Sequence, residues 1–450
     1  MTVQANSSDM KEKLLAKAQK PAADAMRLHP FYGGKIQIAP KVQVRDVNDF
    51  SIWYTPGVAA PCKDIEAHPE KVWEHTNRGN SIAVVSDGTR VLGLGDIGPK
   101  AAMPVMEGKA LIFKYLGGVD AVPICLDTKD PDLFIQTVKL LQPTFGGINL
   151  EDIAKPKCFR ILDTLRAEMD IPVWHDDQQG TAAVTLAGLV NALKVVGKQI
   201  DNVNITMIGA GAANVAILRL ILAAGADPAR VLMVDTKGIL NHSRTDFASD
   251  DPRSEFARIT NGENRQGGIA EAMVGTDVTI ALSRPGPDTI SPEWLKAMNQ
   301  DAILFACANP IPEIWPWEAK EAGVRIVATG RSDFPNQVNN SLGFPGIFRG
   351  VLDVRARTIS DEMAIAAAYE IALCAEEKGL NDEYIMPTMD EWDVFPREAV
   401  ATAMKAQEQG LARLQKSADE LYREAKAKIQ NARTMLDTMV RDGMIAEISE

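Results

Sequence analysis

Two adjacent aspartates, Asp176 and Asp177, stand between the apolar stretch IPVW and a helix-prone run that opens with Gly-Thr-Ala-Ala. Neighbouring carboxylates repel each other, so they need a compensating cation or a shared proton. A second acidic pair, Glu151 and Asp152, precedes the helical stretch that leads back to the first pair. Helix-end charge alone would explain the second pair. The two pairs together predict a site whose oxygen ligands hold Mg²⁺ or Mn²⁺ rather than zinc.

Tyr54 and Lys109 are the candidates for proton transfer. Tyr54 precedes a Thr-Pro-Gly turn, and Lys109 opens an apolar helical run after a glycine-rich stretch that contains Arg90. A lysine beside a cleft can lose its proton near neutral pH and act as a base. Taken alone, Tyr54 is more simply a hydroxyl in the core and Lys109 a solvated helix end. Their catalytic interpretation therefore depends on the other candidate residues around them.

A glycine turn in MIGAGAAN predicts a dinucleotide site. Gly209 permits a tight turn after an apolar strand, and Gly211 lets a pyrophosphate approach the start of the next helix. Asn214 replaces the usual third small residue. A turn that serves only packing is the alternative, but the strand before it and the acid after the next strand favour NAD or NADP binding.

That acid is Asp235, which can bind the adenine ribose hydroxyls and favours NAD, since a carboxylate repels a 2′-phosphate. Lys237 and Arg244 follow it, and either could pair with a 2′-phosphate. The sequence therefore leaves the choice between NAD and NADP open.

Apolar strands alternate with helical stretches around these residues, which predicts an α/β protein with parallel sheets. We expect an N-terminal α/β domain for substrate and metal, a doubly wound Rossmann-type NAD(P)-binding domain and a helical tail. The predicted boundaries are a helical arm at 1–27, the substrate domain at 28–180, the dinucleotide domain at 181–358 and C-terminal helices at 359–450, which pack back on the core or form a dimer contact. The polar segment 241–268 is expected to be a mobile loop.

Composition excludes several functions. The chain has 450 residues and a formal net charge of -12, which argues against nucleic acid or a membrane surface as a partner. Five scattered cysteines without a CxxC pair fit a reducing compartment. The N-terminus lacks the apolar core of a signal peptide, and no apolar run looks long enough to span a bilayer. We expect a cytoplasmic protein.

Several motifs occur in the order found in the malic enzyme family, and the resemblance extends from about residue 30 to 401. They are YTPGVA, SDGTRVLGLGDIGPKAAMPVMEGKA, NLEDI, HDDQQGTAAV, GAGAAN, ANP and NNSLGFPG. The chain resembles a compact bacterial-type member without a phosphotransacetylase-like extension.

The resemblance implies roles for individual residues. Lys109 would draw the substrate hydroxyl proton, Asp176 would orient Lys109, and Tyr54 would return a proton to carbon. The metal ligands would be Glu151, Asp152 and Asp177. Arg90, Asn309 and Asn340 would bind substrate. The cofactor would contact Gly209, Gly211, Ala212, Ala213, Asn214, Asp235, Thr236, Lys237, Asn309 and Asn339.

The implied reaction is the metal-dependent oxidative decarboxylation of L-malate to pyruvate and CO₂ with reduction of NAD(P)⁺, together with oxaloacetate decarboxylation, by a homodimer or higher oligomer. A malolactic-type enzyme that releases lactate is one alternative. An amino-acid dehydrogenase would not need the acid pairs. A catalytically silent metabolite sensor would be expected to lack Lys109 or Tyr54, and both are present.

Overall fold

The computed structural model describes residues 20–247 and 251–448. Its first sheet is wholly parallel, with strand order β2-β1-β3-β4. The carboxyl ends of parallel strands meet at one edge of a sheet, so the acidic residues that follow β3 and β4 lie together there. The strands are β1 (Ser81–Ser86), β2 (Asp120–Cys125), β3 (Gly147–Leu150) and β4 (Val173–His175).

Three helices accompany this sheet: α5 (Pro99–Gly117), α6 (Pro131–Leu141) and α7 (Lys157–Glu168). The sequence sets their ends. Asp130 accepts hydrogen bonds from the backbone at the start of α6, and Gly118 adopts a left-handed conformation at the end of α5.

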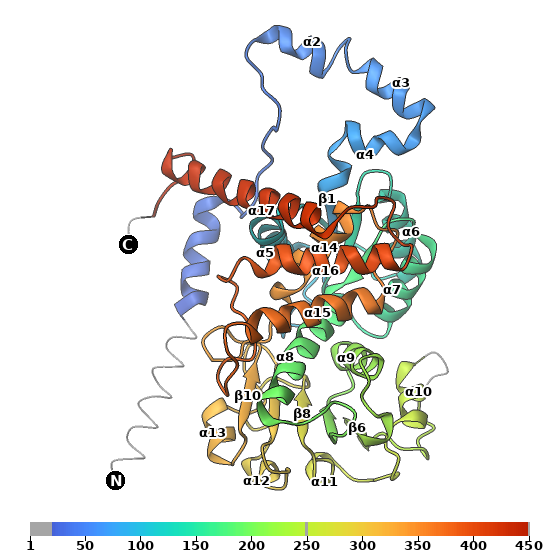
Figure 1. Cartoon of the computed structure of the whole chain (residues 1–450), viewed down its shortest axis with the longest axis vertical. Helices are drawn as coiled ribbons and strands as arrows, with labels where there is room; N and C mark the ends of the chain where they lie inside the picture. The colour runs from blue at the N-terminus through green and yellow to red at the C-terminus, as the bar shows by residue number, and fades with distance from the viewer. Residues whose placement is uncertain (1–19, 248–250, 449–450) are drawn as a thin grey trace.

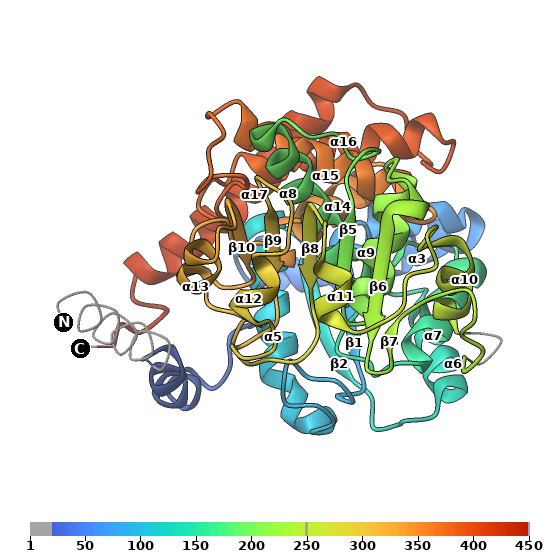
Figure 2. The same ribbon diagram turned by 90° about the horizontal axis from the view of Figure 1, so that it is seen from below.

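The second sheet has the order β10-β9-β8-β5-β6-β7, and only β7 runs antiparallel (Figure 2). Its order reverses beside β5, as in doubly wound folds. The strands are β5 (Ile205–Ile208), β6 (Val231–Asp235), β7 (Gly238–Ile239), β8 (Val278–Ala281), β9 (Ile303–Ala306) and β10 (Ile326–Thr329). The helices among them are α9 (Ala212–Ala223), η5 (Pro228–Arg230), α10 (Pro252–Ile259), α11 (Ile269–Met273), α12 (Pro292–Leu295) and α13 (Pro316–Glu321).

The helix α8 (Thr181–Val196) joins the two sheets and follows a π-helical turn, η4 (Asp176–Gly180). The combined segment Asp176–Val196 is long and apolar enough to cross a membrane by length and composition, contrary to the sequence prediction. However, 72% of its most apolar window is buried inside the protein, as in the core helix of a globular fold. Buried Asn191 anchors it by donating to the carbonyls of Ala372 and Ile385.

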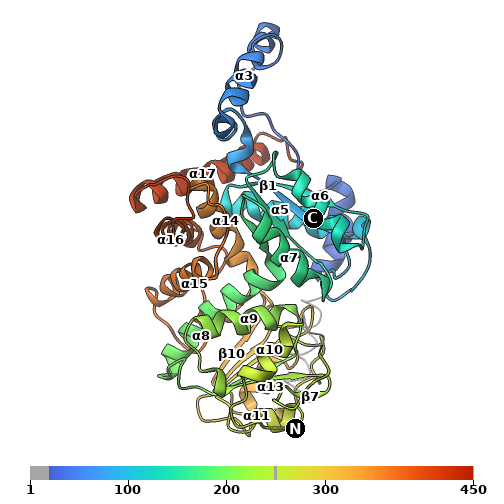
Figure 3. The same cartoon turned by 90° about the vertical axis from the view of Figure 1, so that its right-hand side faces the viewer.

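The C-terminal helices pack beside both sheets (Figures 1 and 3). They are η6 (Asn340–Leu342), α14 (Phe344–Asp353), α15 (Asp361–Glu376), α16 (Val394–Glu408) and α17 (Ala418–Arg441). A buried ion pair between Arg349 and Asp353 also receives Lys428 from α17, which holds the last helix against α14. The predicted α/β class with a doubly wound sheet is confirmed, whereas the domain boundaries remain predictions.

Residues 47–67 stand off from the rest of the chain (Figures 1 and 3), whereas the stretch before them contacts it through Tyr32 and Lys35. Residues 20–32 are helical, and residues 1–19 of the predicted arm lie outside the described residues. Short helices follow: η1 (Val47–Asp49), α2 (Phe50–Trp53), α3 (Ala59–Ala67), η2 (Pro69–Lys71), α4 (Val72–His75) and η3 (Asn77–Asn80).

The segment 241–268 is not the irregular loop that its polarity predicts. Its described part contains α10, and buried Asn261 donates to the carbonyls of Leu240 and Arg265. In its described part, polar side chains bond the backbone, and Phe256 and Ala257 of α10 pack into the core.

Candidate active site

The two predicted acidic pairs meet at the carboxyl edge of the first sheet. Leu150 and His175 are partners in the parallel register, so the acids that follow them are neighbours. The backbone N–H of Asp152 donates to Asp177 Oδ2 at 2.8 Å. Asp152 has a positive φ of 55°, which turns the chain sharply directly after the strand. The sheet therefore brings four carboxylates from two loops into one cluster.

Lys109 reaches into this cluster from α5. Its Nζ lies 2.5 Å from Asp176 Oδ2 and 3.0 Å from Glu151 Oε1, and the side chain is only 8% exposed. The ring of Phe344 packs against the ammonium group, with 4.2 Å between Nζ and the ring centroid. The lysine is thus held by two carboxylates and one aromatic face.

The surroundings of Lys109 affect its pKa in two opposite ways. Burial by itself would lower the pKa of Lys109, but the carboxylates of Asp176 and Glu151 outweigh it and raise that pKa above its ordinary value. The role of Lys109 as a base stays a prediction, and it requires that the negative charge around the lysine be compensated.

Asp176 is fixed by its surroundings. Trp174 Nε1 donates to Asp176 Oδ1 at 3.0 Å. A Cβ at Gly180 would lie 1.9 Å from Asp176 Oδ1, so only glycine fits at the end of the π-helical turn. The same Cβ would lie 3.4 Å from the Cβ of Asn340, which places Asn340 beside the cluster.

The acidic side chains offer the oxygen ligands that a hard divalent cation prefers, but they do not converge on one point. Among the described residues, no three His, Cys, Asp or Glu side chains converge as a metal site. Glu151 instead faces Lys109, whereas Asp152 Oδ2 is buried without a hydrogen-bond partner. Burial and the nearby Asp177 raise the pKa of Asp152 to about 7. An all-oxygen cluster with an unpartnered carboxylate oxygen and excess negative charge fits Mg²⁺ or Mn²⁺.

Arg90 and Asn309 lie on loops beside the cluster, and the Arg90 guanidinium donates to the Leu92 carbonyl at 3.0 Å. The Arg90 N–H donates to the Asp152 carbonyl at 3.0 Å. Asn309, which follows β9, lies across from the same loop, since a Cβ at Gly93 would be 3.0 Å from the Asn309 carbonyl oxygen. Asn339 is engaged elsewhere, because its Oδ1 accepts from the Ser341 N–H at the start of η6.

Tyr54 is the predicted residue that a single chain does not bring to the site. It lies at the end of α2, in the segment that stands off from the body, and its side chain is 71% exposed. No hydrogen bond of Tyr54's hydroxyl occurs among residues 20–247 and 251–448.

The glycine turn has the geometry predicted from its sequence. Gly209 has a φ of 98°, and a Cβ there would lie 2.8 Å from the Leu282 carbonyl oxygen. A Cβ at Gly211 would meet nothing, so the start of α9, with Ala212 and Ala213, is open to a ligand. The cofactor contact of Asn214 stays a prediction, and its side chain has a second role. Its buried Nδ2 donates to the carbonyls of Ile208 and Gly209 and braces the turn from inside.

Asp235 ends β6 already paired. Arg244 donates to both of its carboxylate oxygens, at 3.1 and 2.8 Å, and the Lys237 N–H donates to Oδ1 at 2.8 Å across Thr236. The Lys237 ammonium is directed to Asp246. Asp235, which could bind the ribose hydroxyls, is therefore in direct contact with Arg244, which could bind a 2′-phosphate.

Sequence reasoning missed two residues that shape the site. Phe344 was signalled only by its place in the NNSLGFPG motif. Glu313 carried no signal: its buried carboxylate accepts from the Ser283 N–H at 2.8 Å and the Ala308 N–H at 3.0 Å. It thereby ties together the loops after β8 and β9, which lead to Asn309.

A lysine among carboxylates at the edge of one sheet and a glycine turn of the dinucleotide-binding type on a second sheet are typical of a two-domain oxidoreductase that uses a nicotinamide dinucleotide. Family models agree: residues 33–166 match the malic enzyme N-terminal domain, and residues 178–407 match the malic enzyme NAD binding domain. The chain belongs to the malic enzyme family.

Three known proteins illustrate the similarity of this chain to other members. A bifunctional malic/malolactic enzyme of Bacillus subtilis is 50% identical over 88% of this chain and 96% of its own. An NAD-dependent malic enzyme of Geobacillus stearothermophilus is 50% identical over 85% of this chain and 78% of its own. The crystal structure of Entamoeba histolytica malic enzyme superimposes with a TM-score of 0.95 and 50% identity, covering 98% of this chain and 92% of that one.

The contact between Gly180 and Asp176 gives a first prediction. Gly180→Ala should leave the protein folded but lower kcat with malate by about tenfold or more, since the new Cβ displaces the carboxylate that holds Lys109. Steady-state kinetics and the emission of Trp174, which donates to Asp176, would measure it. Gly108→Ala is the control, because a Cβ there meets nothing. Unchanged kcat in Gly180→Ala would contradict this role.

Proposed function

We propose that the chain oxidises L-malate and decarboxylates it to pyruvate and CO₂, with NAD⁺ or NADP⁺ as oxidant and Mg²⁺ or Mn²⁺ as the metal, and that it also decarboxylates oxaloacetate. The observation that supports this most is the contact of Lys109 with Asp176 and Glu151 beside a dinucleotide turn. The names of the relatives from B. subtilis and G. stearothermophilus support the same substrate.

The chain's own residues divide the proton chemistry. Arg90 holds a substrate carboxylate, and Asn309 donates a hydrogen bond to the substrate. Lys109 accepts the malate hydroxyl proton as C2 is oxidised, and Asp176 fixes its position. Its pKa must fall for this step, and it falls when the charge of Glu151 and Asp176 is compensated.

Glu151, Asp152 and Asp177 would hold the divalent cation, which supplies Lewis-acid stabilisation of the ketone and of the charge that develops as CO₂ leaves. The bond between C3 and the departing carboxylate breaks, its electron pair enters the enol of pyruvate, and Tyr54 gives a proton to C3. Asn340 beside Asp176 orients the substrate in this step.

We infer that Tyr54 serves the site of a second copy. Large apolar side chains are exposed along its segment, including Ile38 at 98%, Val47 at 79% and Trp53 at 49%. Leu92 and Leu94 on the Arg90 loop are also exposed, at 59% and 69%. Exposed apolar surface of this kind indicates a protein interface. A homodimer that covers both surfaces would carry the Tyr54 hydroxyl to the cluster of its partner.

The reaction is tested by absorbance of the reduced nicotinamide with L-malate and Mn²⁺, using NAD⁺ and NADP⁺ separately, with and without a chelator. We expect a rise in absorbance that the chelator abolishes, with pyruvate as product. Binding of the cofactor without turnover would contradict the proposal and favour a silent sensor.

A malolactic activity is the second candidate, because the B. subtilis relative is named as bifunctional. It would convert malate to lactate without accumulation of reduced nicotinamide. Lactate measured in the same reaction decides between the two activities. We place the reaction in the cytoplasm, since all five cysteines are free thiols.

Complementation of two inactive variants tests the shared site. Lys109→Ala and Tyr54→Phe should each lose turnover by orders of magnitude, because each removes one proton-transfer group. Mixed dimers contain one site with both groups intact, so mixing and re-equilibrating the two should restore about a quarter of wild-type activity. Each variant re-equilibrated with itself is the control. No recovery, with subunit exchange verified by mass, would show that both residues act within one chain.

The Asp235–Arg244 pair gives a prediction on cofactor choice. Asp235→Ser should raise kcat/KM for NADP⁺ relative to NAD⁺ by about tenfold or more, because it removes a repelling carboxylate and leaves Arg244, still held by Asp246, to bind the 2′-phosphate. Titration of reduced cofactor fluorescence measures binding independently of turnover. Asp201→Ser, an exposed acid elsewhere, is the control. An unchanged ratio would mean that Asp235 does not face the adenine ribose.

A further inference from the structure

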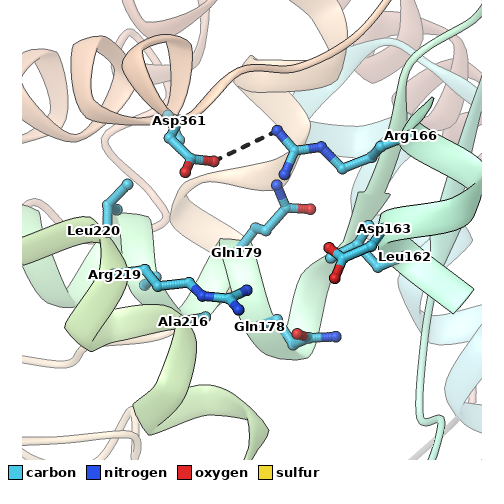
Figure 4. Close-up of a pocket in the computed structure, with 11 residues that line it drawn as sticks. Leu162, Asp163, Arg166, Gln178, Gln179, Ala216, Arg219, Leu220 and Asp361 are labelled. Atoms are coloured by element: carbon cyan, nitrogen blue, oxygen red, sulfur yellow. Dashed lines mark hydrogen bonds and ion pairs between the residues drawn. The ribbon is translucent and has the colours of Figure 1, made fainter. Parts of the chain in front are cut away.

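A cavity of about 50 Å³ lies between helices that accompany the two sheets, and the turn η4, which also carries Asp176 and Asp177, forms part of its lining (Figure 4). Its walls come from α7 of the first sheet, α9 of the second, α15, and the turn η4 with the start of α8. At roughly 10–15 Å³ for each water centre, such a volume suits a few waters or one small ion. The catalytic side chains lie outside its lining.

The inner wall of this cavity carries amide donors that lack acceptors. Gln178 lines the cavity and is only 2% exposed, and its Nε2 has no hydrogen-bond partner. Gln179 lines it too; its Oε1 accepts from the His175 N–H at 3.0 Å, which leaves its Nε2 without a partner. Buried polar groups are nearly always hydrogen-bonded, so two buried donors indicate that an acceptor belongs here.

Two guanidinium groups complete the donor set from opposite sides (Figure 4). Arg166 reaches in from α7 and also donates to the Ile359 carbonyl at 2.7 Å and approaches Asp361 at 3.5 Å. Arg219 reaches in from α9, and no ion pair or hydrogen bond engages it among the described residues. The acids Asp163 and Asp361 line the cavity as well, but both are exposed, at its rim.

We propose that this cavity binds a small oxoanion, with the size of phosphate or a short carboxylate, between Arg219, Arg166 and the amides of Gln178 and Gln179. Guanidinium groups donate paired hydrogen bonds to the oxygens of such anions. The bound oxoanion bridges α7 and α9 and so fastens the two sheets together at the turn that carries Asp176 and Asp177. The site is independent of the reaction proposed above.

The test is thermal unfolding of the full chain without malate, cofactor or metal, so that turnover plays no part. Inorganic phosphate and acetate are titrated separately at constant ionic strength set with chloride. A ligand that binds only the folded state raises the unfolding temperature with a saturable dependence on its concentration. We expect such a rise for the wild type, with either anion or with both. Phosphate alone would identify a tetrahedral ligand, and acetate a carboxylate.

Arg219→Gln is the informative variant, since Arg219 is exposed and its loss should not unfold the chain. It should need about tenfold more anion for the same rise, which corresponds to about 1.4 kcal/mol. Arg258→Gln, an exposed arginine on α10 with the same change of charge, should respond like the wild type. No saturable rise in the wild type, or equal responses in the wild type and Arg219→Gln, would overturn the proposal.

Discussion

The burial of Lys109 among carboxylates is the constraint on which the rest of the site depends. A buried ammonium is costly unless it is paired, and carboxylates at the edge of a sheet are costly unless they are compensated. The charges offset each other, because Lys109 lies between Asp176 and Glu151 and pairs with both carboxylates. The register of β3 with β4, the tight turn at Gly180 and the ring of Phe344 serve this one contact.

In the second sheet, the loops after β5, β8 and β9 are held by hydrogen bonds between buried side chains and the backbone. Asn214 and Glu313 carry out the same task with different chemistry, because each uses a buried polar side chain to hold backbone groups at the carboxyl ends of strands. The outer face of the turn at Gly211 stays open, since a Cβ there would meet no other atom. A rigid frame of this kind presents backbone N–H groups to a pyrophosphate without reorganisation.

Much of this arrangement could be predicted from the sequence, and the failures have physical causes. The acidic pairs follow successive strands, so their meeting at one edge required only that the sheet be parallel. Gly209 could be assigned because a positive φ leaves few other choices. The charge on Lys109 could not, since it depends on carboxylates that are 42 and 67 residues away in the chain but in contact in space. The bonds of the Asn214 side chain to the Ile208 and Gly209 carbonyls could not be predicted, because a side chain's direction is set by packing and not by its motif.

Tyr54 shows a different limit, because its position relative to the cluster is not a property of one chain. The segment that carries it exposes apolar side chains that a monomer would leave in water, at a cost that grows with the area exposed. The Arg90 loop exposes Leu92 and Leu94 beside the cluster that lacks the tyrosine. In the proposed homodimer, burial of both surfaces would remove that cost and would supply the hydroxyl in the same contact. Assembly and catalysis would then be coupled by the hydrophobic effect, and a chain diluted to a monomer would keep its fold and its cofactor turn but lose the proton donor.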